Sequence, residues 1–216
     1  MNTLLTVLVA TGPLAAGWSG HVLWLGKRLH TARRDPLTGL WTREGFTRRA
    51  TALLRDDRAV VILADVDHFK QINDRHGHAA GDALLKATAD RLAHYVGRHG
   101  VAGRLGGDEF AAVVIDTDGT VADLLAVLHG VLARPADQAN PHVATTVSLG
   151  WARAADHLGE NLSALLSRAD EAMYAAKQAR AGVRRAGLGR LFATVAGRRS
   201  GRRGARTDAP AIVAAA

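Results

Sequence analysis

The sequence predicts an α/β fold in which helices pack on a central mixed sheet, in the ferredoxin-like arrangement. A continuous apolar run at residues 59–64 has the length and composition of a buried strand. A glycine pair at 106–107 stands between two further apolar segments and is typical of a hairpin turn. Amphipathic helical patterns are interleaved with these strands, which is the order expected of an α/β sandwich.

The elements are expected in the order strand, helix, hairpin, helix, strand, helix, preceded by one more helix. Helices are predicted at 42–54, 81–96, 121–133 and 162–180, where apolar residues recur at helical spacing. Strands are predicted at 59–64, at 142–153 and on both sides of the glycine pair between 103 and 115. These elements lie within one body, residues 35–183.

The N-terminal segment is predicted to be a membrane span. Residues 2–26 carry no formally charged side chain and are long enough to cross roughly 30 Å of hydrocarbon as a helix. We therefore expect a transmembrane helix at 1–26, a basic linker at 27–34, and the rest of the chain on the cytoplasmic side of the inner membrane. Two alternatives stay open: a signal peptide, and an apolar helix buried in a soluble dimer, which would make the chain cytoplasmic.

The charge of the chain is concentrated at its two ends. The net charge is +8, and residues 184–216 are rich in Arg, Gly and Ala, which predicts a basic and mostly disordered tail. Within the tail, Leu188, Leu191, Phe192 and Val195 have the spacing of a helix lying on an anionic membrane, with a solvated tail as the alternative. Only this tail would support nucleic-acid binding, so that function is not favoured. The absence of cysteine excludes disulfides, zinc–thiolate sites and thiol catalysis.

Paired carboxylates follow the apolar strand. Asp65 and Asp67 are two residues apart, so in an extended strand both leave the same face. If the glycine hairpin lies beside this strand, Asp108 comes near Asp65, and the carboxylates with a backbone carbonyl suit Mg²⁺. The alternative is that Asp65 caps the following turn and Asp67 is solvated.

A polar segment leads from this strand into the next helix. Lys70 is suited to a phosphate, and Asn73 with Asp82 offers the amide and carboxylate that pair with the edges of guanine. His76 and His78 are expected in a loop, in hydrogen-bonding or packing roles rather than as metal ligands. In the hairpin, Gly106 and Gly107 permit positive φ and let a ligand approach the backbone closely.

Five segments together resemble the GGDEF domains of bacterial diguanylate cyclases. They are DPLTGLWTR, ADVDHFKQINDRHGHAAGD, RLGGDEF, VSLGWA and ADEAMYAAK, in this order between about Asp35 and Val183. The resemblance implies a fold like the palm of nucleotide cyclases and the condensation of two GTP into cyclic di-GMP with release of pyrophosphate. Because each domain would bind one GTP, it also implies a homodimer as the active species.

The resemblance also implies roles for individual residues. Asp65, the carbonyl of Val66 and Asp108 would hold Mg²⁺, with Mn²⁺ as a substitute, and Glu109 would assist. The substrate would be bound by Phe69, Lys70 and Lys177 at the phosphates, by Asn73 and Asp82 at guanine, by Gly106 and Gly107 at the open turn, and by His78. Asp108 and Glu109 are the expected catalytic residues.

The chain departs from the family pattern at three places. Gly97 and Gly100 stand where many relatives carry the Arg and Asp of a product-inhibition site, so inhibition through that site is not predicted. The last predicted helix ends AKQARAG instead of the usual AK followed by Gly-Arg-Asn, which leaves Lys177 in place and moves an arginine to 180. Thr42 replaces a usual Asn. A weak or inactive GTP-binding signalling module is therefore the alternative function.

Overall fold

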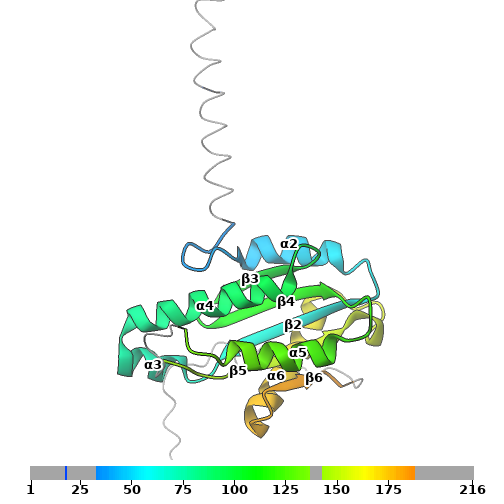
Figure 1. Cartoon of the computed structure of the whole chain (residues 1–216). Coiled ribbons are helices and arrows are strands. Elements are labelled where there is room, and N and C mark those ends of the chain that lie inside the picture. The colour runs from blue at the N-terminus through cyan, green and yellow to red at the C-terminus, as the bar shows by residue number, and fades with distance from the viewer. Residues whose placement is uncertain (1–17, 19–32, 137–142, 188–216) are drawn as a thin grey trace, which may run out of the picture.

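The computed structural model describes residue 18 and the ranges 33–136 and 143–187. The helices are α2 (Arg43–Leu53), α3 (Phe69–His76), α4 (His78–Val96), α5 (Val121–Leu132) and α6 (Leu162–Ala179), with a short 3₁₀ turn η1 (Ala154–Asp156). The strands are β1 (Trp41–Thr42), β2 (Ala59–Val66), β3 (Val101–Gly106), β4 (Glu109–Ile115), β5 (Val147–Arg153) and β6 (Val183–Arg185). Figure 1 shows these elements around one sheet.

The six strands form a mixed sheet in the order β1-β3-β4-β2-β5-β6. The central strand β2 is antiparallel to both β4 and β5, whereas β1–β3 and β5–β6 are parallel pairs. The register places Asp65 opposite Glu109 on one side and opposite Ser148 on the other. The last residues of β2 therefore lie next to the glycine hairpin, as the sequence predicted.

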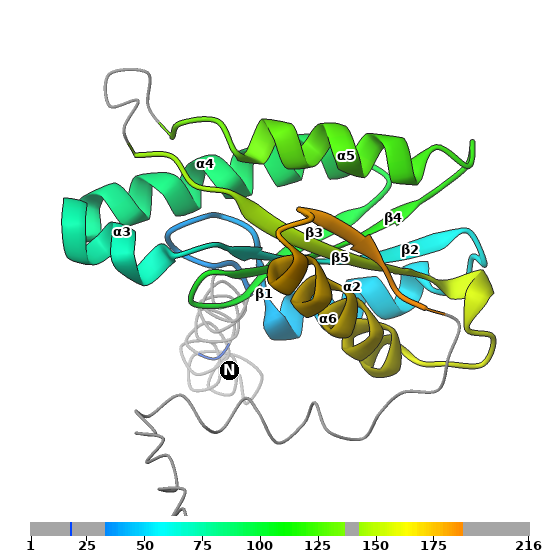
Figure 2. The ribbon, with the colours of Figure 1, turned by 90° about the horizontal axis from the view of Figure 1, so that it is seen from below.

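Helices cover both faces of the sheet (Figure 2). On one face, α4 and α5 pack on alternate residues of β2, including Val60, Ile62 and Ala64. On the other face, α2 and α6 pack on Val61 and Leu63. Because β2 is covered on both sides, all eight of its residues are buried, which explains why it is a continuous apolar run rather than an alternating one.

The structure corrects several element boundaries. The polar segment after β2, expected as a loop, forms the helix α3, and the next helix begins at His78 rather than at residue 81. The strand expected at 142–153 begins only at Val147. Residues 183–185 form the edge strand β6, so the start of the predicted tail belongs to the folded body.

The expected elements at the two ends of the chain lie outside the described residues. The N-terminal span at 1–26 falls there apart from Trp18, as does the amphipathic segment from residue 188 onward. Across the described ranges, no helix is both long enough and apolar enough to cross a membrane.

Candidate active site

Three carboxylates gather where β2 ends beside the β3–β4 hairpin. Asp65 is the penultimate residue of β2, and its register partner on β4 is Glu109. The N–H of Val66 donates to the carbonyl of Asp108 at 3.2 Å, which fixes the turn residue next to the strand end. The side chain of Asp65 is buried, whereas Asp108 and Glu109 are partly exposed. The sequence predicted that Asp108 would approach Asp65, and the hairpin register confirms it.

Lys177 of α6 supplies a cation to this cluster. Its ammonium donates to Oδ1 of Asp65 at 2.5 Å and lies 3.6 Å from Oδ1 of Asp67. Burial raises the pKa of Asp65 above its ordinary value, the charges of Asp108 and Glu109 raise it further, and Lys177 opposes them only in part. Burial acts to lower the pKa of Lys177, but its bond to Asp65 and the charges of both aspartates outweigh this and raise it. The site therefore attracts positive charge.

Asp67 supports the site from the side of β5. Its carboxylate accepts hydrogen bonds from the hydroxyls of Thr146 at 2.6 Å and Ser148 at 2.8 Å, and its carbonyl accepts from the hydroxyl of Thr145. The side chain is buried, so the alternative of a solvated Asp67 is wrong. Asp65 and Asp67 do share one face, since Lys177 reaches both. The hydroxyls that satisfy Asp67 come from residues about eighty positions away, and no local pattern indicated them.

The hairpin turn is open to solvent, and hydrogen bonds from Arg104 hold it in place. Gly107 has φ of +46°, a conformation that favours glycine, and a side chain at Gly106 or Gly107 would meet no atom within 4 Å. Behind the turn, Arg104 donates twice to the carbonyl of Gly107, at 2.9 and 2.7 Å. The same guanidinium bonds the carboxylate of Asp35 at 3.1 Å. The role of Arg104 was not predicted from the sequence. It ties Asp35 to the turn and leaves the outer side of the turn free for a ligand.

The residues expected to recognise guanine lie on two consecutive helices. Asn73 is half-buried on α3, and Asp82 is exposed in the first turns of α4. Gly81, directly before Asp82, faces Asn73 so closely that a Cβ there would lie 1.9 Å from its Oδ1. The structure therefore places the side chain of Asn73 against α4, at the residue that precedes Asp82 in the chain.

The two histidines of this region are not in a loop. His76 is the last residue of α3 and His78 the first of α4, with Gly77 at φ of +82° between them, and both side chains are exposed. In the described ranges, no group of three or more His, Asp or Glu side chains is arranged to hold a metal ion.

The expected phosphate contacts fall at the start of α3. Phe69 packs its ring partly against the core, and Lys70 is exposed. The N–H groups of Gln71 and Ile72 donate to the carbonyl of His68, whereas in the described part of the chain those of Phe69 and Lys70 form no hydrogen bond. Free N–H groups at a helix N-terminus are suited to an anion. Here the backbone of Phe69, rather than its ring, is the suitable contact.

The donors at the strand end fit a hard divalent cation. They are the carboxylates of Asp65 and Asp108 and the carbonyl of Val66, oxygen ligands of the kind that Mg²⁺ prefers, with no sulfur or imidazole among these three groups. The ion pair of Asp65 with Lys177 shows that the cluster already binds one positive group. Asp65, the carbonyl of Val66 and Asp108 would hold such an ion.

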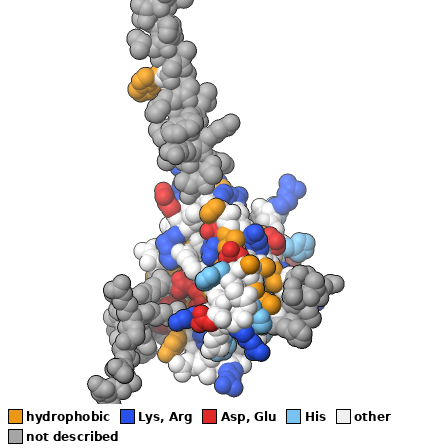
Figure 3. All heavy atoms as spheres, turned by 90° about the vertical axis from the view of Figure 1, so that its left-hand side faces the viewer, with side chains coloured by type: hydrophobic (Ala, Val, Ile, Leu, Met, Phe, Trp, Pro, Cys, Tyr) orange, Lys and Arg blue, Asp and Glu red, His pale blue; other side chains and the backbone are white. Residues whose placement is uncertain are grey.

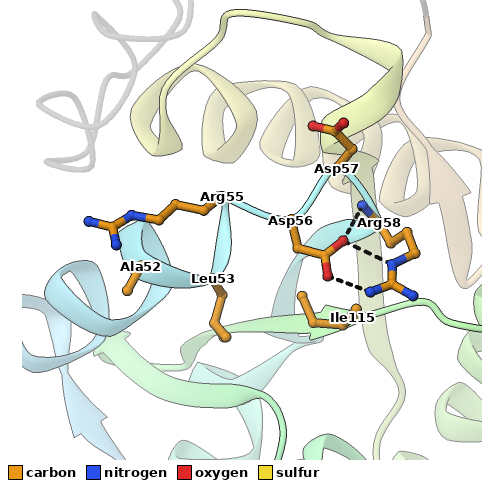
Figure 4. Close-up of a pocket in the computed structure, with 7 residues that line it drawn as sticks. All are labelled: Ala52, Leu53, Arg55, Asp56, Asp57, Arg58 and Ile115. Atoms are coloured by element: carbon orange, nitrogen blue, oxygen red, sulfur yellow. Dashed lines mark hydrogen bonds and ion pairs between the residues drawn. The ribbon is translucent and has the colours of Figure 1, made fainter.

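A hollow elsewhere on the molecule is not part of this site. It measures about 640 Å³ and lies near the opposite end of β2, lined by Ala52, Leu53, Arg55, Asp56, Asp57, Arg58 and Ile115 (Figure 4). Two of its charged side chains pair with each other, since Arg58 donates to both oxygens of Asp56. On the side of the molecule seen in Figure 3, acidic, basic and histidine side chains are interspersed, so that side offers no continuous basic surface for a nucleic acid.

Comparison with known proteins identifies the family. The family model described as "Diguanylate cyclase, GGDEF domain" matches residues 32–182. The chain belongs to the GGDEF family. A protein of Streptomyces ambofaciens described as an uncharacterized 19.3 kDa protein is 49% identical over 162 residues, which are 74% of this chain and 87% of that protein. The Escherichia coli diguanylate cyclase DgcN is 40% identical over 161 residues, 71% of this chain and 39% of DgcN.

Solved GGDEF structures share the fold. The GGDEF domain of TpbB from Pseudomonas aeruginosa superposes with a TM-score of 0.66 at 35% identity, over 72% of this chain and 95% of that one. The coiled coil and GGDEF domain of DgcB from Caulobacter crescentus, solved with c-di-GMP, gives 0.69 at 26% identity, over 86% of this chain and all of that one. The similarity to DgcN and to full-length TpbB spans under two fifths of their lengths, so it concerns their GGDEF parts.

The departures from the GGDEF pattern have defined places in the structure. Gly97 ends α4 with φ of +61°, and Gly100 lies in the link to β3, where a Cβ would be 2.6 Å from the carbonyl oxygen of Val113. Arg180 caps α6 in the left-handed conformation, φ +50°, and is exposed. The altered helix end therefore leaves Lys177 within its last turn and in contact with the carboxylates.

Proposed function

We propose that this chain is a diguanylate cyclase, which condenses two GTP molecules into cyclic di-GMP and two pyrophosphates between two GGDEF domains. The observation that carries the proposal is the cluster of Asp65, Asp108 and Glu109 at one strand end, with Lys177 beside it. The proposal is also supported by the match to the GGDEF family and by the similarity to relatives named diguanylate cyclases.

In the proposed reaction, the 3′-oxygen of one GTP forms a bond to the α-phosphorus of the other. The bond from that phosphorus to the bridging oxygen breaks, pyrophosphate leaves, and the hydroxyl proton is lost. A second identical step closes the ring. Asp108, on the open turn, accepts the proton, and Glu109 holds negative charge beside it. Lys177 and the free N–H groups at the start of α3 bind phosphate oxygens and stabilise the leaving pyrophosphate.

Mg²⁺ held by Asp65, the carbonyl of Val66 and Asp108, when bound, would lower the pKa of the attacking hydroxyl and neutralise phosphate charge. Asn73 and Asp82 would select guanine, because an amide and a carboxylate complement its edges and reject those of adenine. Gly106 and Gly107 would leave room for the sugar and phosphates. His78, exposed at the start of α4, would lie at the edge of the substrate site.

The test is an assay with GTP. Purified full-length protein with GTP and Mg²⁺ is expected to form cyclic di-GMP, identified by its mass. Asp108→Ala is expected to lower the rate by about a hundredfold or more, since it removes a metal ligand and the proton acceptor. Absence of product at high protein concentration would exclude the proposal.

The alternative is a GTP-binding signalling module with little or no turnover. It is favoured by the altered end of α6, where an exposed Arg180 stands in place of the family's Gly-Arg-Asn. It predicts saturable GTP binding without product, and the same assay separates the two functions.

The position of the chain in the cell is a further part of the proposal. The uncharged residues 2–26, followed by a basic linker, favour a membrane anchor with the GGDEF domain in the cytoplasm. Fractionation of cells, with the N-terminus probed from outside, tests it; recovery of the whole protein in the soluble fraction would exclude the anchor.

A further inference from the structure

The side chain of Asn73 lies directly on the backbone of the following helix. A Cβ built at Gly81 of α4 would be 1.9 Å from Oδ1 of Asn73 and 2.9 Å from its Cγ. Both distances are far below any real contact, so the amide of Asn73 occupies the space that a side chain at position 81 would need. Gly81 is buried and has no conformational need for glycine, because it sits inside a regular helix.

Packing, rather than hydrogen bonding, holds this amide. In the described part of the chain, no hydrogen bond from another group fixes the side chain of Asn73. Its backbone is held, since the carbonyl of Asn73 accepts from the N–H of Gly77 at 2.9 Å where α3 ends. The ring of Phe69 closes the other side, with Cε2 3.2 Å from the same built Cβ. The orientation of the amide therefore depends on the absence of a side chain at position 81.

Gly81 also stands next to Asp82 in the chain. Gly81 is therefore next to both residues assigned to guanine. The side chain of Asn73, from α3, packs against Gly81, and Asp82 is the next residue of α4. We propose that Gly81 is a specificity-determining positioning residue, which sets the amide of Asn73 beside the carboxylate of Asp82 so that both can bind one guanine. This inference rests on the proposed use of GTP.

A methyl group at position 81 is expected to change specificity without unfolding the protein. The closest atom is the end of a rotatable side chain, so the amide of Asn73 turns away and the backbone keeps its path. Alanine also has a higher helix propensity than glycine. Gly81→Ala is thus expected to keep or raise the melting temperature and to lose guanine recognition.

The test measures binding of α,β-methylene analogues of GTP and ATP, which cannot react, to full-length protein with Mg²⁺. We expect Gly81→Ala to weaken binding of the guanine analogue about tenfold or more, since a hydrogen-bonding partner is displaced. Binding of the adenine analogue is expected to stay unchanged. Gly130→Ala is the matched control, because Gly130 is also inside a helix and a Cβ there meets no atom within 4 Å. It is expected to change neither affinity.

A double variant separates positioning from general damage. If Gly81 acts through Asn73, then Asn73→Ala and Gly81→Ala/Asn73→Ala bind the guanine analogue equally, because the displaced group is already gone. If Gly81→Ala fails to fold, the double variant is expected to fold. Three results would overturn the inference while the wild type still prefers the guanine analogue. Gly81→Ala could weaken binding of both analogues equally, it could leave the selectivity unchanged, or the losses of affinity in Gly81→Ala and Asn73→Ala could add up in the double variant. A wild type without guanine selectivity would overturn the proposed function and the inference together.

Discussion

At the scale of single residues, the site is organised around a buried carboxylate that requires a cation. Asp65 has a raised pKa because burial and two neighbouring carboxylates disfavour its charge, and Lys177 offsets part of that cost. The pKa of Asp65 is thus higher in the folded protein than the value of 3.8 that an unfolded chain would have. The neutral form of Asp65 therefore stabilises the fold at low pH, and this stabilisation is lost as the pH rises from 3.8 through the pKa of the folded state. Lys177 limits that loss.

Lys177→Met is expected to destabilise the metal-free protein in a pH-dependent way. At neutral pH the loss is about 1 kcal/mol, below the usual range for a hydrogen bond to a charged group, because Lys177 is 37% exposed and solvent screens the pair. The difference from wild type shrinks as the pH falls toward 3.8, where Asp65 becomes neutral and no ion pair remains to be lost. Urea unfolding in EDTA at several pH values measures it.

The control for this variant is Lys86→Met, an exposed lysine on α4 that forms no ion pair in the described part of the chain. It is expected to be close to wild type at every pH. A loss for Lys177→Met that did not change with pH would contradict the assignment of the effect to Asp65.

At the scale of elements, the sequence predicted those whose patterns are strong and local. The predictions of β2 and of the glycine turn were correct. Burial on both faces requires a continuous apolar run, and positive φ favours glycine, so both features can be recognised in the sequence. The helix α3 was missed, since only Ile72 of its eight residues is buried and its polar side chains resemble a loop. The edge strand β6 has three residues and owes its form to pairing with β5, which no local pattern records.

The packing of α6 on the sheet depends on one glycine of β5. A Cβ at Gly150 would lie 2.0 Å from the carbonyl oxygen of Ala169 and 2.3 Å from the backbone nitrogen of Met173. These are backbone atoms, so the helix itself must shift. Gly150→Ala is expected to cost about 1–3 kcal/mol, the range for an overfilled core, and to move Lys177 away from Asp65.

Denaturant unfolding of Gly150→Ala, next to the control Gly130→Ala, measures the cost. Stability equal to wild type would mean that α6 does not pack on β5 this closely. The contrast with Gly81 is one of mechanism: at Gly150 the collision is with backbone and affects the fold, whereas at Gly81 it is with the end of a side chain and affects recognition.

At the scale of the whole molecule, the sequence predicted the residues of the site better than the residues that hold them in position. Asp65, Asp108 and Glu109 come together as expected because the hairpin register is determined by local turn chemistry. The supporting hydrogen bonds were not predicted. Arg104 and Asp35 hold the turn, and Thr146 and Ser148 hold Asp67. Their bonds join distant parts of the chain, and only the three-dimensional fold brings these polar groups together.

One domain presents one cluster of carboxylates and one pair of residues assigned to guanine, whereas the product of the proposed reaction contains two guanosines. The proposed reaction therefore needs two domains, each holding one GTP, and both must be competent for the ring to close. A mixture of wild type with Asp108→Ala at fixed total concentration is then expected to lose cyclic di-GMP synthesis with the square of the wild-type fraction, since random pairing leaves that share of intact dimers. Dilution into an unrelated protein, at a concentration where wild type stays paired, gives a linear loss. A linear loss with Asp108→Ala as well would mean that one intact domain suffices, and would contradict the two-domain reaction.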